Sequence, residues 1–130
     1  MHNYFKSFGY ALEGLRAAFT TERNLKFFGC VYVCSLLLGW FFAIGARNWE
    51  MVIFTGGLFF SVELINTALE HFADAFDDHT KSQNDHKTAA IKATKDIAAA
   101  ASLVCALAWA MVLIIIFLPY VMTFLGWSNL

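Results

Sequence analysis

Long apolar stretches alternate with shorter polar ones along this chain. Residues 27–46, between Lys26 and Arg47, contain 20 positions without a charged side chain, and residues 97–130 contain no charged side chain at all. A helix that crosses a bilayer needs about 20 mostly apolar residues, so each stretch predicts a membrane span. Only 12 uncharged residues separate Glu50 from Glu63, so a middle span must include part of the polar stretch that follows.

The N-terminal segment predicts a helix of a different kind. Apolar side chains recur there every three or four residues, at Phe5, Phe8, Leu12, Leu15 and Phe19. This period places them on one face of a helix over residues 4–19, which predicts an amphipathic helix lying on the membrane surface. Thr20 and Thr21 are expected to cap the next helix, with Glu22 in its first turn, where a negative charge suits the helix dipole.

The remaining boundaries predict an all-α membrane protein with a single domain over residues 1–130. We expect a tight turn at 45–49 and a polar loop at 77–85. A third long helix should start near Asp85 or His86 and weaken at Pro119, because proline lacks the backbone N–H that a helix needs. The predicted spans therefore cover residues 24–46, 50–76 and 86–118.

Composition supports the membrane class and excludes several others. Apolar residues make up 59% of the chain and charged residues 15%, against about 25% charged in an average soluble domain. The net charge of −1 gives no sign of a nucleic-acid partner. Charged residues interrupt the N-terminal segment, so we do not expect a signal peptide. The three cysteines lie in apolar helices without a neighbouring histidine, which argues against a zinc site.

Basic residues predict the orientation of the spans. Four precede the first span and four lie between the second and third: Lys6, Arg16, Arg23 and Lys26, then Lys81, Lys87, Lys92 and Lys95. Arg47 alone lies on the other side. Loops rich in Lys and Arg remain in the cytoplasm. The N-terminus and the 77–95 loop are therefore expected to be cytoplasmic.

The middle span carries a polar stripe in the sequence "VELINTALEHFADAF", residues 62–76. A helical residue advances by about 100°, so Asn66, Glu70 and Asp74 fall at about 300°, 340° and 20° when measured from Glu63. All four therefore share one face. An ionisable residue inside a membrane is costly and is usually functional, which makes Glu63 the first candidate. A packing role is the alternative, above all for Asn66, because polar side chains also hold membrane helices together.

Several charged residues should meet near the inner membrane boundary. By counting along each predicted helix, the following four fall in one plane: Glu22, Glu70, Lys95 and Asp96. Glu63 lies about 10 Å deeper. Carboxylates at the water edge suit Mg²⁺ and the phosphates that it carries. A deeper carboxylate could take a proton from a lipid hydroxyl. The pattern thus favours the transfer of phosphate from a soluble nucleotide to a membrane alcohol.

Two segments resemble a known family. "VELINTALEHFADAF" followed by "KATKDIAAAASLV" is similar to the signature of the small prokaryotic diacylglycerol kinase and undecaprenol kinase family, and "SFGYALEGLRAAFTTERN" resembles its N-terminal helix. The resemblance covers nearly the whole chain. It implies an integral kinase of the bacterial inner membrane that uses ATP and Mg²⁺, phosphorylates a lipid alcohol, and works as a homotrimer with sites shared between subunits.

The resemblance also implies roles for particular residues. They are Glu63 as catalytic base on the lipid hydroxyl, Glu22 and Glu70 as metal ligands, Asn66 as a positioning residue for phosphates or acceptor, Lys95 and Asp96 as nucleotide contacts, and Tyr10 and Arg16 as contacts near the phosphates or the lipid.

The chain departs from the family pattern between Asp74 and Lys95. The histidine that usually stands seven residues before the lysine is replaced by Thr88, with His86 two residues earlier, and the loop is about seven residues longer. The acceptor stays open, because "ERN" resembles the undecaprenol branch and "GLRAA" the diacylglycerol branch.

Other functional classes fit the sequence less well. A non-catalytic membrane subunit would use the polar stripe only for packing, and would not need Glu22, Lys95 and Asp96 level with Glu70. A proton-coupled transporter would need polar residues through the outer half of the bundle, where residues 51–60 and 106–118 have almost none. The two glycines of "GYALEGLR" lack the lysine and the preceding strand of a P-loop.

Overall fold

Helices account for almost all of the chain in the computed structural model, which describes residues 2–80 and 85–127, with side chains for 5–76 and 89–127. The helices are α1 (His2–Thr21), α2 (Arg23–Phe41), α3 (Ala46–Thr80) and α4 (Asp85–Phe124). Within the described residues, three segments are long and apolar enough to cross a membrane: Arg23–Phe41, Ala46–Phe76 and Ala89–Phe124. The predicted all-α class is therefore confirmed, and three of its helices could be the predicted spans.

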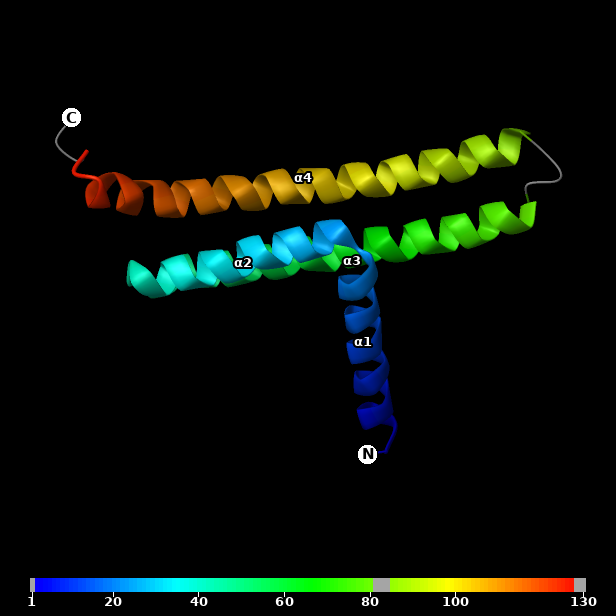
Figure 1. The fold of residues 1–130 in the computed structure, drawn as a ribbon, viewed down its shortest axis with the longest axis horizontal. Helices are drawn as coiled ribbons and strands as arrows, with labels where there is room; N and C mark the ends of the chain where they lie inside the picture. Colours follow the sequence, from blue (N-terminus) through cyan, green and yellow to red (C-terminus); the bar gives the residue numbers. More distant parts are fainter. Residues whose placement is uncertain (1, 81–84, 128–130) are drawn as a thin grey trace.

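The long helices α3 and α4 form the frame of the molecule. Figure 1 shows them side by side and antiparallel, with α2 along one half of α3 and α1 running crosswise from the junction with α2. The α3–α4 pair continues well beyond that junction. The end of α1, the start of α2 and the middle of α3 consequently meet in one region.

Three boundaries differ from the expectations. The hydroxyls of Thr20 and Thr21 donate to carbonyl oxygens of α1, at Ala17 among others, so they close the end of α1 instead of capping α2. The turn after α2 occupies residues 42–45, one short segment earlier than predicted, with Ala43 at a φ of 48°. Residues 77–80 continue α3, and residues 81–84 of the expected loop lie outside the described part.

We expected α4 to weaken at Pro119, but the helix continues through this residue and ends at Phe124. Proline removes one backbone donor, but membrane helices tolerate it when neighbouring groups satisfy the backbone. The missing donor is the one that would reach the carbonyl of Ile115, four residues earlier. The Thr123 hydroxyl donates to the Pro119 carbonyl at 2.9 Å, a separate bond within the same helix. The expected start near Asp85 is confirmed.

An aromatic cluster fills the middle of the three-helix bundle. The rings of Phe59 on α3 and Trp109 on α4 stack with centroids 5.1 Å apart, and Phe28 and Tyr32 from α2 pack against Trp109. Phe59 and Trp109 are almost fully buried. This cluster, which also includes Phe60, joins all three spans on the side of Glu63 that faces the 42–45 turn.

A glycine lets α2 and α3 approach beside this cluster. A Cβ added at Gly56 would lie 2.4 Å from Cε2 of Tyr32, whereas a Cβ at Gly57 would meet nothing within 4 Å. We expect Gly56→Ala to destabilise the protein by about 1–3 kcal/mol through overpacking. Gly57→Ala is the matched control and should not lower stability. Thermal unfolding in detergent measures both variants, and equal midpoints would contradict this account of the packing.

Candidate active site

The polar stripe of α3 becomes steadily more exposed toward the end that extends beyond α2. Glu63, Asn66 and Thr67 are buried, with 6, 8 and 7% of their surface exposed. Glu70 is half-buried and Asp74 is exposed. The stripe therefore leads from the interior of the bundle to its polar end on a single helix face.

Glu63 faces α4 from the buried end of this stripe. Its Oε2 accepts a hydrogen bond from the Ser102 hydroxyl, and Ser102 is as buried as Glu63. The carboxylate thus points into the bundle and not toward the acyl chains. A buried carboxylate needs hydrogen-bond donors in place of water, and Ser102 supplies one.

Asn66 and Glu70 form the middle of the stripe, one helical turn apart. The Asn66 amide Nδ2 donates to Glu70 Oε1 at 3.1 Å. The other end of the amide, Oδ1, is buried and has no hydrogen-bond partner within the described part of the chain. A buried oxygen without a partner costs free energy. It is therefore a site at which a hydroxyl or another donor can bind.

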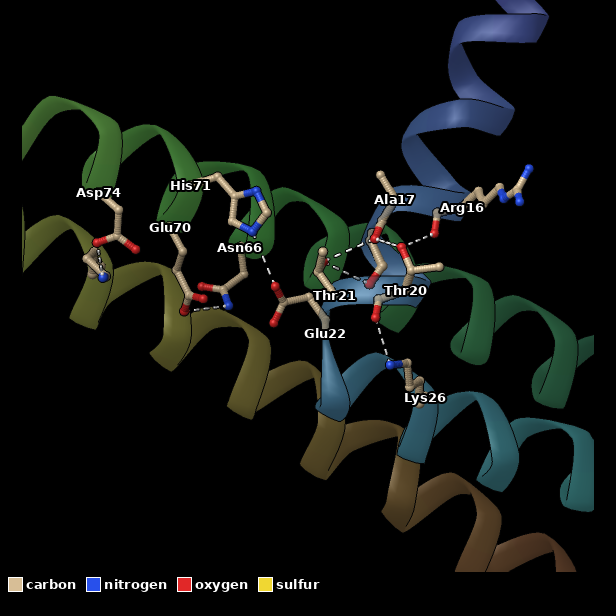
Figure 2. Close-up of polar contacts among 12 residues, drawn as sticks. Arg16, Ala17, Thr20, Thr21, Glu22, Lys26, Asn66, Glu70, His71 and Asp74 are labelled. Carbon is tan, nitrogen blue, oxygen red and sulfur yellow. Dashed lines mark hydrogen bonds and ion pairs between the residues drawn. The ribbon is translucent and has the colours of Figure 1, made fainter. Parts of the chain in front are cut away.

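Glu22 reaches the stripe from the α1–α2 junction. Its backbone is extended at the N-cap of α2 (φ −89°, ψ 118°), and its side chain makes no capping bond. Instead Oε1 lies 3.2 Å from Nε2 of His71, which follows Glu70 on α3. Figure 2 shows the Glu22 carboxylate pointing toward α3, on the side where Asn66 and Glu70 project. The structure therefore brings Glu22 and Glu70 to the same region of one chain.

This donor set fits a metal that arrives with a nucleotide. Among the described residues, no group of three or more His, Cys, Asp and Glu side chains could hold an ion. The Glu22–Glu70 pair offers carboxylate oxygens only, with Asn66 Oδ1 buried nearby and unpartnered. Mg²⁺ is usually bound by one or two carboxylates, with phosphates and waters completing its shell.

Lys95 approaches the stripe from α4. Its Nζ donates to Asp74 Oδ1 at 2.7 Å, one turn beyond Glu70. Asp74 is exposed but forms this ion pair. Asp96 is exposed on the neighbouring position of α4. The predicted lysine is thus placed beside the carboxylates.

Two predicted residues do not reach this region within one chain. Tyr10 on α1 is 70% exposed. Arg16 is also exposed, and Figure 2 shows its side chain directed away from Glu22 and Glu70. Any role for either residue requires contacts from outside the chain described here.

Sequence reasoning missed two contacts of the site. Ser102 follows a run of alanines and seemed to be part of an apolar span. His71 was not among the predicted site residues. Both contacts depend on how neighbouring helices are rotated, so no spacing along the chain could reveal them. The only available signal for Ser102 was its polarity within an apolar segment.

Comparison with known proteins decides the family. Residues 9–117 match the family described as prokaryotic diacylglycerol kinase. The chain belongs to this family. It is 34% identical to an undecaprenol kinase of Bacillus subtilis (strain 168) over 119 residues, which cover 92% of this chain and 91% of the relative. A diacylglycerol kinase of Synechocystis sp. is 34% identical over 106 residues, which cover 82% of this chain and 57% of the relative.

Membership of the prokaryotic diacylglycerol kinase family confirms the resemblance seen in the sequence. Together with the three apolar helices, it makes the chain a bacterial multi-pass membrane protein of the lipid kinase type. A kinase of this type uses a nucleotide and a lipid as substrates.

Proposed function

We propose that the protein transfers the γ-phosphate of MgATP to the hydroxyl of a membrane lipid alcohol. The observation that carries this proposal is the order of the carboxylates along α3. The buried Glu63 lies seven residues before the half-buried Glu70 on the same helix face. Seven helical residues rise about 10 Å. Such a separation suits a reaction between a nucleotide in water and an acceptor in lipid.

The polar end of the stripe is the proposed nucleotide side. Glu22 and Glu70 would hold Mg²⁺, which neutralises charge on the phosphates when it is bound. Lys95 offers a positive charge to the same phosphates, and it now pairs with Asp74. Because that pair is exposed, it contributes at most about 1 kcal/mol, so a phosphate can replace Asp74 at little cost. Asp96 would contact the nucleotide beside it.

The buried end is the proposed acceptor side. Glu63 would act as general base, taking the proton of the lipid hydroxyl as the oxygen attacks the γ-phosphorus. Asn66 lies one turn away with its unpartnered Oδ1. This oxygen would accept a hydrogen bond from the incoming hydroxyl and so hold it between the two ends of the stripe.

A cavity beside the stripe supports entry of the acceptor from the membrane. It measures about 520 Å³ and lies between α1 and α3. Its lining is formed mainly by small and apolar residues: Ala11, Gly14, Leu15, Ala17, Ala18, Leu64, Thr67, Ala68 and His71. We propose that the hydrocarbon next to the reacting hydroxyl lies here, with α1 on the membrane surface above it.

Filling this cavity should weaken the lipid substrate selectively. A Cβ added at Gly14 meets nothing within 4 Å, so Gly14→Leu can place its side chain in the cavity without a clash. We expect kcat/KM for the lipid to fall roughly tenfold or more, with KM for MgATP unchanged. Gly9→Leu is the matched control, because a Cβ added at Gly9 also meets nothing within 4 Å and Gly9 does not line the cavity. Equal effects of the two variants on lipid kinetics would exclude the cavity as an acceptor site.

The complete site is proposed to form in a homotrimer. Large apolar side chains remain exposed on all three apolar helices, for example Leu37, Phe54 and Ile115, so further protein surface can pack against them. Tyr10 and Arg16 would then reach the phosphates or the lipid of a neighbouring subunit. We place the protein in the inner membrane, with the N-terminus and the 77–95 loop in the cytoplasm, where ATP is available.

One assay tests the activity and the acceptor together. Purified protein with labelled ATP and Mg²⁺ is given diacylglycerol in one reaction and undecaprenol in the other. The relative that aligns over nearly its full length is named for undecaprenol, so undecaprenol is the first acceptor to test. Labelled phosphatidic acid would instead identify diacylglycerol as the acceptor. Absence of transfer to any lipid alcohol would favour a non-catalytic subunit whose polar stripe only packs helices.

A further inference from the structure

Ser102 makes an unusual contact for a hydroxyl inside an apolar helix. Elsewhere in the bundle such hydroxyls donate to carbonyl oxygens of their own helix, as Ser35 does to Tyr32 and Ser61 to Gly57. Ser102 instead donates across the interface between α4 and α3, to Oε2 of Glu63. Its hydroxyl is therefore committed to another side chain and not to its own backbone.

Packing alone does not require a hydroxyl at this position. Residues 98–101 are all alanine, so α4 presents small side chains throughout this turn. An alanine at 102 would fill nearly the same space. The feature that serine adds is one O–H donor, and that donor meets the buried carboxylate.

The donor matters because Glu63 has few other sources of stabilisation for its charge. Among the described residues, no basic side chain pairs with it. The nearest acidic or basic side chain along α3 on the same face is Glu70, seven residues away, and on α4 the nearest are Lys95 and Asp96, at least six residues from Ser102. Hydrogen bonds to a charged group are about twice as strong as neutral ones.

We propose that Ser102 is a positioning residue for Glu63, an inference that rests on the function proposed above. The hydroxyl fixes Oε2, so that Oε1 is left as the atom that takes the proton. The lipid O–H bond breaks and its proton binds Oε1. The electron pair left on the lipid oxygen forms the bond to the γ-phosphorus. The bond from that phosphorus to ADP breaks, and ADP keeps the electron pair.

The experiment compares Ser102→Ala with Ser35→Ala in purified protein. Ser35 is a matched control, since only 4% of its surface is exposed and its hydroxyl donates to a carbonyl of its own helix. For Ser102→Ala we expect kcat to fall roughly 10- to 100-fold, the range for a hydrogen bond to a charged group, while KM for MgATP stays constant. Ser35→Ala should change neither kinetic constant.

Two further variants separate the possible failures. Ser102→Thr keeps the hydroxyl, so it should restore most of the lost kcat; equal losses for alanine and threonine would indicate packing and overturn the proposal. An unchanged kcat in Ser102→Ala would overturn it as well. Glu63→Gln tests the underlying function separately. If that variant is inactive while Ser102→Ala is normal, only the role of Ser102 fails; if Glu63→Gln remains active, the proposed base itself fails.

Discussion

Glu63→Gln is expected to reduce phosphate transfer by at least about 10³-fold, within the range attributed to a general base. Glutamine has nearly the same size and can still accept the hydrogen bond from Ser102, so the packing of α3 against α4 should be kept. It cannot take a proton from a lipid hydroxyl. The measurement is the initial rate of lipid phosphorylation at saturating MgATP, together with MgATP affinity, which should remain close to that of the unchanged protein.

Glu50→Gln provides the control for this variant. Glu50 lies on the same helix but is exposed and far from the stripe, near the start of α3. Its substitution should leave the rate unchanged. Full activity of Glu63→Gln would remove the general base from the mechanism, and with it the reason for a buried carboxylate at this depth.

Glu70→Ala should abolish metal-dependent binding of the nucleotide. Loss of a residue that merely supports a metal ligand typically costs 10–100-fold in affinity, so loss of a direct ligand should exceed about 100-fold. Isothermal titration of ATP in detergent, with and without Mg²⁺, measures the effect. The difference between the two titrations should disappear in the variant.

Glu13→Ala controls for the removal of a negative charge near the membrane surface. Glu13 is exposed on α1, so its loss should preserve the dependence on Mg²⁺. If MgATP bound equally well to Glu70→Ala and to the unchanged protein, the metal would have to be held elsewhere.

The spans and the stripe could be predicted from the sequence because they depend on local properties. Stretches without charge identify membrane helices, since an unpaired charge in hydrocarbon is costly. The period of about 100° per residue places Glu63, Asn66 and Glu70 on one face regardless of their neighbours. The inward orientation of this face follows from the cost of exposing it to lipid.

Contacts between helices could not be predicted in the same way. The bonds from Ser102 to Glu63 and from His71 to Glu22 depend on helix rotation and on the angle at the α1–α2 junction. Those are set by packing, for example where Gly56 admits Tyr32. The boundary errors have local causes of another kind. The hydroxyls of Thr20 and Thr21 bond to carbonyls of α1 instead of capping α2, and α4 continues through Pro119.

The aromatic cluster around Trp109 has a consequence for how water can reach Glu63. Its rings close the bundle on the side of Glu63 that faces the 42–45 turn, and Trp109 Nε1 itself has no hydrogen-bond partner among the described residues. Aromatic rings are large and mostly apolar. Water therefore approaches the carboxylate more easily from the side of Glu70 and Asp74, where the polar stripe is exposed. If Glu63 is the proposed base, its proton should leave by that side.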